Sequence, residues 1–366
     1  MRIALVSDVY LPRLGGIEVQ VADLATHLRA AGHEVRVVTA TPGPSAEGVA
    51  RLVPPVPLPA PVNPWAGPAL RAELAAADVV HVHLGVVAPF ASTAAKIALA
   101  ARRPTVVTWH SLLSGVPIPY AGRWRRWMQG GVVRTAVSAA AAEQVRTVTR
   151  LPSPIDVLPN GISVDDWAAL DALPSRLRPG DPVRMVSAIR FARRKRPLQL
   201  IRLARRIRRL VPSDQPLELV VAGAGPLWEP VRRRVQAAGA DWISLPGRLS
   251  RKELARLYQR SHLYLNPGRM ESFGIAALEA RTAGLAVAGL ADTGLTEFIR
   301  HGVDGVLAPT DRELADGVAA LIVDPGALNA ILEHNRSVRP EQSWDNVVRA
   351  TLAAYDRAIA VRERED

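Results

Sequence analysis

The chain has 366 residues, too many for one ordinary hydrophobic core and typical of two domains of α/β size. Its hydrophobic fraction of 48% and charged fraction of 22% are those of a soluble globular protein. Cysteine is absent, which excludes disulfides and thiolate metal sites and permits an intracellular location. The net charge of +12 favours anionic partners such as phosphates, acidic lipid or nucleic acid.

Membrane and export signals are missing from the sequence pattern. No apolar run reaches the ~20 residues that cross a bilayer. The N-terminal run "MRIALVSDVY" is too short for a signal peptide and meets Asp8 at once, so it predicts a first strand. We expect a cytoplasmic protein, or one held peripherally on the inner face of the plasma membrane.

The first half alternates strands and helices. Near-continuous apolar runs at 2–8, 34–40, 78–84 and 104–110 are typical of a parallel sheet covered on both faces. Between the first two runs, apolar residues at helical spacing predict a helix that stops at Gly32. The Pro-rich segment 41–64 is too long for an ordinary loop and predicts a surface excursion.

A second strand series starts at residue 183, after a Pro-, Asp- and Arg-rich linker. Apolar strands begin near residues 183, 217, 242, 263 and 285, each followed by a helical stretch. The pattern predicts two doubly wound parallel-sheet, Rossmann-like domains facing one cleft, over residues 1–168 and 183–342.

Ligands of open parallel sheets bind beyond the carboxyl ends of the strands, and polar groups follow several of these ends. Gly15 and Gly16 open a helix, where backbone N–H groups can approach a phosphate, although a tight turn explains them almost as well. His110 comes at the end of a strand, where a single histidine more often has a structural hydrogen-bonding role, and this role is favoured more strongly for His81 and His83.

After the first strand of the second domain, Arg190 and Lys195 lie five positions apart in a loop that opens a helix. A planar guanidinium and a point-like ammonium suit a diphosphate clamp. The chain has few lysines, which favours a specific need for this one. The alternative is a solvated basic helix start, since residues 193, 194 and 196 are also arginines.

Two further segments carry candidate ligand groups. "VAGAGP", residues 221–226, lacks the third glycine of a dinucleotide fingerprint, so we expect its glycines to shape a turn under a nucleotide. "ESFGIAALE" places Glu271 and Glu279 eight positions apart. A continuous helix would separate them by ~12 Å, about the span from the sugar ring to the ribose of a nucleotide sugar. Alternatively, Glu271 complements a helix N-terminus and Glu279 faces water.

Together these motifs resemble the family-4 retaining glycosyltransferases of GT-B fold, most closely the phosphatidylinositol mannosyltransferase and related lipid or small-molecule group. The match covers most of the chain and includes "GGIE", "TWHS", "AVS", the Arg190/Lys195 pair, "VLPNGI", "VAGAGP" and the Glu-x7-Glu motif. The resemblance implies a C-terminal helix, residues 343–366, that crosses back to the first domain.

The resemblance also implies roles for individual residues. Glu279 would hold the ribose hydroxyls and Glu271 the hydroxyls of the donor sugar, while Arg190 and Lys195 would neutralise the departing diphosphate. His110 would lie near the sugar and the acceptor. The remaining donor-binding residues are Gly15, Gly16, Gly223, Ser272, Phe273 and Gly274.

The family works without a metal or other cofactor and retains the anomeric configuration. We expect a same-face substitution in which the departing phosphate takes the acceptor proton. The donor would be a GDP- or UDP-linked hexose. The sequence leaves the base, the sugar and the oligomeric state open.

Two basic, apolar segments bear on the acceptor. Residues 120–131 mix Trp124, Trp127 and Met128 with arginines, which suits a helix resting on an anionic membrane. Residues 197–210 are better explained as a packed helix with a solvated face. A membrane lipid is therefore the favoured acceptor, ahead of a soluble natural-product or thiol precursor.

Other classes of protein fit less well. A GT-B nucleotide-sugar epimerase would use the donor without an acceptor. A nucleic-acid binder would explain the charge, but the basic residues are spread over many helices and binding motifs are missing. A NAD-dependent enzyme has the least support.

Overall fold

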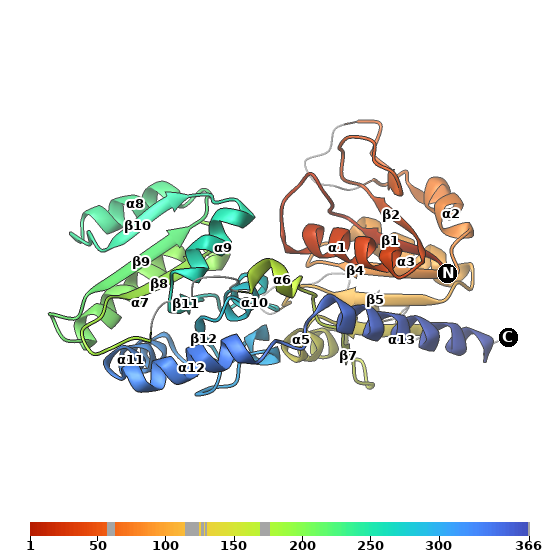
Figure 1. Ribbon diagram of the computed structural model, residues 1–366. Helices are drawn as coiled ribbons and strands as arrows, with labels where there is room; N and C mark the ends of the chain where they lie inside the picture. The colour runs from red at the N-terminus through yellow and green to blue at the C-terminus, as the bar shows by residue number, and fades with distance from the viewer. Residues whose placement is uncertain (57–62, 114–123, 126–127, 129, 169–175, 365–366) are drawn as a thin grey trace. The chain divides into compact units, whose positions relative to one another are not determined.

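The computed structural model describes residues 1–56, 63–113, 124–125, 128, 130–168 and 176–364 (Figure 1). The chain forms two compact units, one of Met1–Gly161 with Gln342–Asp366 and one of Ile162–Glu341. The division falls after Gly161, shortly before the expected linker at 168–182, of which residues 169–175 lie outside the described part. Each unit is treated by itself below.

The first unit is built on a parallel sheet with strand order β3-β2-β1-β4-β5-β6-β7. Its strands are β1 (Arg2–Ser7), β2 (Glu34–Thr39), β3 (Val49–Arg51), β4 (Val79–Leu84), β5 (Thr105–Trp109), β6 (Val132–Ala136) and β7 (Asp156–Val157). The strand β3 lies inside the Pro-rich segment that was expected to be only a surface excursion. Its three residues pair with the edge of β2, and so short a run between prolines carries no strand signal.

The helices of the first unit cover both faces of this sheet (Figure 1). They are α1 (Gly16–Ala30), α2 (Gly67–Ala75), α3 (Pro89–Ala100), α5 (Ala139–Thr149) and α13 (Trp344–Glu363). The C-terminal helix α13 packs beside α1 on β4, β5 and β6. Leu24 of α1 and Tyr355 of α13 are buried with Ile3 and Leu5 of β1 in one core. The residues of alternate strand positions therefore face α1 and α13.

The second unit has a parallel sheet with strand order β10-β9-β8-β11-β12-β13. Its strands are β8 (Val183–Ala188), β9 (Leu217–Ala222), β10 (Ile243–Gly247), β11 (Leu263–Leu265), β12 (Ala286–Leu290) and β13 (Gly305–Ala308). Its helices are α6 (Val164–Trp167), η1 (Arg193–Lys195), α7 (Pro197–Leu210), α8 (Trp228–Gln236), α9 (Arg251–Gln259), α10 (Ile275–Thr282), η2 (Gly294–Glu297), α11 (Asp311–Val323) and α12 (Pro325–Ser337).

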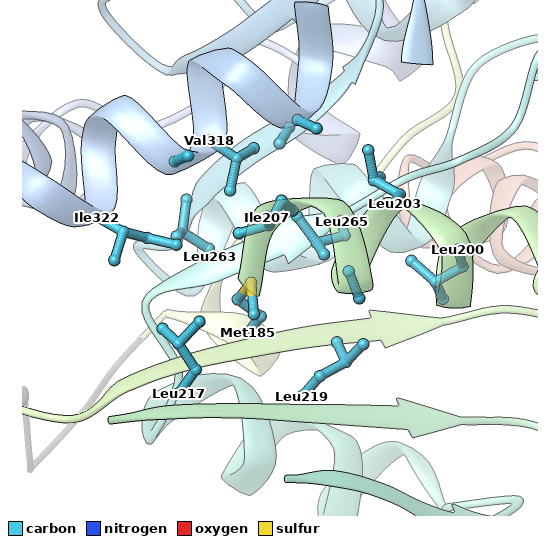
Figure 2. Close-up of a cluster of buried hydrophobic side chains, with 14 of the residues drawn as sticks. Met185, Leu200, Leu203, Ile207, Leu217, Leu219, Leu263, Leu265, Val318 and Ile322 are labelled. Carbon is cyan, nitrogen blue, oxygen red and sulfur yellow. The ribbon is translucent and has the colours of Figure 1, made fainter. Parts of the chain in front are cut away.

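The core of the second unit explains why α7 forms where it does (Figure 2). Leu200, Leu203 and Ile207 recur at helical spacing and are buried against Met185 and Leu219 of the sheet. Burying each such side chain contributes roughly 1.5–3 kcal/mol. The interpretation of residues 197–210 as a packed helix is therefore confirmed.

Among the described residues, no single helix is long and apolar enough to cross a membrane. The helices α11 and α12 reach the required length and composition only as a pair, and the chain bends by 98° between them. Their apolar side chains, including Val318, Ile322 and Leu332, belong to the core of the second unit.

Candidate active site

The predicted site residues fall in both units. Gly15, Gly16 and His110 belong to the first unit, and the remaining predicted residues belong to the second. The predicted residues lie between the carboxyl end of a strand and the α-helix that follows it, except Gly16, which begins α1, and Glu279, which lies inside α10.

In the second unit, the loop after β8 is hydrogen-bonded to the "VAGAGP" loop after β9 and packs closely against it. The amide of Phe191 donates to the carbonyl of Ala224 at 2.9 Å. A Cβ on Gly223 would lie 1.9 Å from the carbonyl oxygen of Ile189, and Gly223 has a φ of +137°. Only glycine fits there. The predicted donor-binding residue Gly223 therefore lies against the backbone next to Arg190.

The side chains of Lys195 and Glu271 form an ion pair, with 2.7 Å between Nζ and Oε2. Lys195 is 37% exposed and Glu271 only 12%, so the carboxylate is fixed from the protein side while the ammonium reaches solvent. Arg190 is exposed and has no ion-pair partner among the described residues. The cationic side chains of Arg190 and Lys195 and the mostly buried carboxylate of Glu271 thus all follow strands at one end of the sheet.

The segment around Glu271 is a loop, because α10 begins only at Ile275. The assumption of a continuous helix from Glu271 to Glu279 is therefore wrong, and the ~12 Å separation based on it no longer applies. The amide of Gly294 donates to the carbonyl of Glu271 at 2.9 Å. A Cβ on Gly294 would lie 2.1 Å from the carbonyl oxygen of Ser272. The turn η2 thus supports Ser272, and glycine is required for that close approach.

Tyr264 lies beneath both glutamates. Its hydroxyl donates to the carbonyl of Ala188 at 3.1 Å, at the end of β8. Burial is the main cause that raises the pKa of Tyr264, and the charges of Glu271 and Glu279 raise it further. The phenol therefore stays neutral, and its hydroxyl is held at the end of the strand that leads to Arg190.

Sequence reasoning missed the role of Arg196. Its guanidinium donates to the carbonyl of Pro267 at 2.7 Å and to Oδ1 of Asp311 at 2.9 Å. The hydrogen bond from Arg196 lowers the pKa of Asp311, although burial opposes it. Arg196 thus anchors the loop that carries Lys195, whereas Arg193 is exposed. A run of four basic residues gives no signal that separates these roles.

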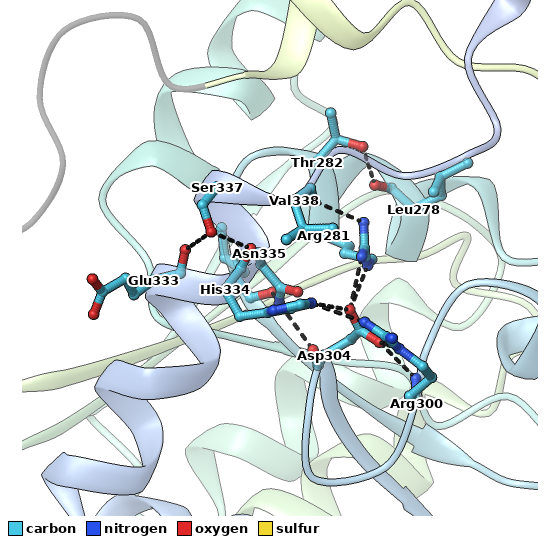
Figure 3. Close-up of polar contacts among 11 residues, drawn as sticks. Leu278, Arg281, Thr282, Arg300, Asp304, Glu333, His334, Asn335, Ser337 and Val338 are labelled. Atoms are coloured by element: carbon cyan, nitrogen blue, oxygen red, sulfur yellow. Dashed lines mark hydrogen bonds and ion pairs between the residues drawn. The ribbon is translucent and has the colours of Figure 1, made fainter.

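The far end of α10 is fixed by a buried ionic cluster (Figure 3). Asp304 accepts from Nη2 of Arg281 at 2.7 Å and from Nε of Arg300 at 2.9 Å, and Nε2 of His334 lies 3.2 Å from it. Burial would raise the pKa of Asp304, but the hydrogen bonds from Arg300 and Arg281 lower it to about 2. Because Arg281 is on α10, the cluster holds the helix that carries Glu279.

In the first unit, the start of α1 is covered by a carboxylate. Glu18 is buried, and its Oε1 lies 3.1 Å from Nε of Arg13. A Cβ on Gly15 would lie 2.3 Å from Oε2 of Glu18. The structure therefore gives Gly15 a packing role that the sequence did not suggest: it makes room for Glu18 at the positive end of α1. An anion approaching Gly16 would meet this carboxylate.

A row of polar side chains lies under α13. His81 is fully buried, with Nδ1 2.9 Å from the hydroxyl of Tyr355 and Nε2 2.7 Å from that of Thr108. His81 therefore has the structural role expected for it. Burial is the main cause that lowers its pKa, to about 3.

His110 belongs to the same row. Its Nε2 lies 2.9 Å from Nδ1 of His83, and its side chain also bonds to that of Asn160. Burial lowers the pKa of His110 to about 4, although the bond with Asn160 opposes the shift. His110 is thus a neutral imidazole near pH 7. His83, expected to be only structural, directly contacts this candidate.

The predicted membrane-contacting helix at 120–131 lies mostly outside the described residues. Trp124 and Met128, which are described, are only 3% and 1% exposed. Trp124 packs edge-on against Trp109, with 6.1 Å between ring centroids. These two side chains belong to the core of the first unit, so they do not contribute to a membrane surface.

The family profile described as Glycosyltransferase Family 4 matches residues 14–166, and that described as Glycosyl transferases group 1 matches residues 172–338. The chain is a family-4 glycosyltransferase. This family assignment and the enzyme class confirm what the motifs predicted.

Relatives of this glycosyltransferase span nearly its whole length. It is 27% identical to the GDP-mannose-dependent alpha-(1-6)-phosphatidylinositol monomannoside mannosyltransferase of Mycobacterium tuberculosis, covering 97% of this chain and 98% of the relative. It is 28% identical to the D-inositol 3-phosphate glycosyltransferase of Mycobacterium avium, covering 94% and 89%. The enzyme of the same name from Kribbella flavida is 27% identical, covering 96% and 92%.

Solved structures share the fold. The crystal structure of Anabaena HepE in complex with UDP and glucose matches the glycosyltransferase with a TM-score of 0.75 at 16% identity, covering 97% of this chain and 99% of that one. WaaG, a glycosyltransferase involved in lipopolysaccharide biosynthesis, matches with a TM-score of 0.66 at 16% identity, covering 96% and 98%. The predicted GT-B fold is confirmed.

Proposed function

We propose that this glycosyltransferase moves a hexose from a GDP- or UDP-linked sugar to a hydroxyl of an inositol-containing acceptor, with a membrane lipid favoured over a soluble inositol phosphate. The main support is the Lys195–Glu271 pair, at 2.7 Å, beside the exposed Arg190 at one end of the second sheet. The names of the relatives, which contain phosphatidylinositol monomannoside and D-inositol 3-phosphate, support the acceptor class.

The second unit would bind the donor. Arg190 and Lys195 would neutralise the diphosphate, and their contribution grows as it departs. Lys195 binds Oε2 of Glu271, and Oε1 would accept from a sugar hydroxyl. Glu279 would accept from the ribose hydroxyls. In the first unit, the neutral imidazole of His110 would share its N–H between Asn160 and a substrate hydroxyl.

The proposed reaction is a same-face substitution with retention of configuration. The bond between the anomeric carbon and the diphosphate oxygen breaks while the acceptor oxygen bonds to that carbon. The acceptor proton passes to the departing phosphate oxygen. We propose that no metal takes part, because two cationic side chains supply the neutralising charge. A covalent glycosyl-enzyme trapped by mass spectrometry would contradict this mechanism.

Calorimetry with UDP, GDP and ADP in the presence of EDTA tests the donor site. We expect one nucleoside diphosphate to bind the wild type, and Glu279→Gln to weaken it at least tenfold, because hydrogen bonds to charged groups contribute about 1.5–3 kcal/mol. Glu229→Gln, an exposed carboxylate on α8, is the matched control and should bind like the wild type. If none of the three binds, the proposed function is wrong.

A transfer assay with the donor identified in this way tests the acceptor. Radiolabelled sugar should move to phosphatidylinositol in vesicles, and a product from inositol 3-phosphate alone would assign the soluble acceptor instead. A changed nucleotide sugar formed without any acceptor would show an epimerase.

A further inference from the structure

We propose that His83 is a positioning residue for His110, and that one ordered water molecule in the adjoining cavity completes their hydrogen-bond chain. The chain of hydrogen bonds fixes which ring nitrogen of His110 carries the proton. The catalytic consequence rests on the proposed function, in which His110 contacts a substrate hydroxyl. The structural part can be tested without it.

The two histidines lie on one face of the first sheet. His83 is at the end of β4 and His110 directly follows β5, and both face the side covered by α1 and α13. Nδ1 of His83 lies 2.9 Å from Nε2 of His110. The other nitrogen of His83, Nε2, is buried and has no hydrogen-bond partner among the described residues. A buried unpaired polar atom costs about 1–3 kcal/mol, so it requires an explanation.

A small cavity beside His83 explains why its Nε2 has no protein partner among the described residues. The cavity has a volume of about 20 Å³ and is lined by residues that include His83, His110, Asn160 and Trp344. This volume is enough for one water molecule, and buried waters typically bind to polar groups that lack protein partners. The indole Nε1 of Trp344 is a second buried atom without a partner in the described part of the chain. One water between these groups would satisfy both.

The chemistry of the groups sets the direction of the chain. An indole N–H can only donate, so the water accepts from Trp344. A water can accept twice, and it is the bond in which His110 donates to Asn160 that decides that this water donates to Nε2 of His83. The proton of His83 is then on Nδ1, which donates to Nε2 of His110. His110 therefore keeps its own proton on Nδ1. The hydrogen bond with Asn160 favours a protonated imidazole, which agrees with His110 acting as a donor.

This tautomer decides what His110 can do. With Nε2 occupied by His83, the only group that His110 can present to a substrate is the N–H that it shares with Asn160, and not a lone pair. Burial also lowers the pKa values of both rings, so both stay neutral near pH 7. His110 is thereby fixed as a neutral donor that can orient a hydroxyl oxygen, which fits a reaction in which the phosphate, and not a histidine, takes the proton.

Nitrogen NMR of protein labelled with 15N-histidine tests the tautomer directly. In the wild type we expect His110 to carry its proton on Nδ1, and in His83→Leu to shift toward the Nε2–H form. His110 in the Nε2–H form in the wild type, or unchanged in His83→Leu, would overturn the proposal. A high-resolution crystal structure should show a water within hydrogen-bond distance of Nε2 of His83, and a dry cavity would overturn that part.

Three substitutions of His83 separate positioning from simple packing. Asparagine keeps a polar atom near the position of Nδ1 and should retain kcat within about twofold, whereas glutamine keeps one near Nε2 and leucine keeps none. We expect both of these to lower kcat about tenfold, which corresponds to one hydrogen bond, with an unchanged KM for the nucleotide sugar. Equal effects of all three variants would contradict the proposal.

His262→Gln is the matched control. His262 is a buried histidine of the second unit whose Nδ1 accepts from the amide of Arg184 at 3.0 Å. We expect this variant to lower stability without changing kcat of the folded fraction. If the His83 variants behave in the same way, His83 is only structural. If no nucleoside diphosphate binds the wild type, the proposed function fails, while the NMR result still decides the tautomer.

Discussion

In the first unit the buried row of polar side chains under α13 is neutral at pH 7. In the second unit, the buried cluster around Asp304 is ionic. The first joins His81, Thr108 and Tyr355 through ring nitrogens and hydroxyls. The second pairs Asp304 with two cations, Arg281 and Arg300. Both clusters lie behind candidate site residues, His110 in one unit and Glu279 in the other.

The difference matters because the two kinds of cluster fail in different ways. A neutral hydrogen-bonded group costs little to bury, and losing one partner costs about 1–3 kcal/mol. A buried charge costs several kcal/mol to desolvate, so removing its partner is more damaging. The neutral row instead depends on tautomers, and acid disrupts it as soon as the unfolded histidines become protonated.

The largest effect is expected for Arg281→Met. Removing this guanidinium leaves the 1% exposed carboxylate of Asp304 without its most buried partner. We expect a loss of about 3 kcal/mol in the free energy of unfolding of the second unit, at the lower end for a broken buried pair because Arg300 and His334 remain. Urea unfolding read by pulse proteolysis, with peptides from each unit, measures it.

Arg300→Met is the matched control, because it binds the same carboxylate from a side chain that is 63% exposed. Exposed ion pairs contribute about 0–1 kcal/mol. Similar losses of stability in the two variants would show that burial does not distinguish the two arginines. The ionic cluster would then not be more sensitive to the loss of a buried partner than to the loss of an exposed one.

A second prediction compares how the stabilities of the two units depend on pH. Burial lowers the pKa values of His81 and His110 to about 3 and about 4, and also lowers that of His83, from an unfolded value of ~6.5. As the pH falls from 6.5 toward 5, the unfolded first unit therefore comes to bind nearly three more protons at these histidines than the folded unit, and its stability decreases as the pH decreases. Burial raises the pKa of Asp8 to about 7, so between pH 6 and pH 5 the folded unit holds a proton at Asp8 that the unfolded unit lacks. This proton offsets one of the three that the unfolded histidines bind. The second unit has one comparable group, His262, with a pKa of about 4.

The net difference is about one proton, so between pH 6 and pH 5 the first unit should lose about 1.4 kcal/mol more than the second. The lowered pKa of Asp304, about 2, affects the second unit only below about pH 5, where the unfolded carboxyl begins to bind protons. Unit-resolved urea unfolding at the two pH values checks this order. A second unit that weakens as much as the first would refute it.

Much of this architecture is predictable from sequence because parallel strands buried on both faces leave continuous apolar runs. The strands β1, β2, β4 and β5 and the helix α1 lie where those runs and their spacing place them. The short β3 could not be predicted, since its three residues owe their conformation to pairing with β2.

For the candidate site, sequence spacing predicted which residues follow strand ends but not which side chains meet. The Lys195–Glu271 pair joins residues 76 positions apart. His83 and His110 belong to neighbouring strands, and only the register of β4 and β5 brings them together. Glu18 covers the start of α1 through a side-chain conformation that local propensity does not determine.

The smallest effect is expected for Tyr355→Phe, which removes one hydroxyl from the neutral row. Nδ1 of His81 then loses its partner at 2.9 Å, and we expect a loss of about 1 kcal/mol in the stability of the first unit. Tyr258→Phe is the control, because in the described part of the chain its hydroxyl donates to a backbone carbonyl, that of Ala276, at 3.3 Å. Unit-resolved unfolding should show the larger loss for Tyr355→Phe. Equal losses would mean that His81 finds another partner, and that the neutral row tolerates damage which the ionic cluster cannot.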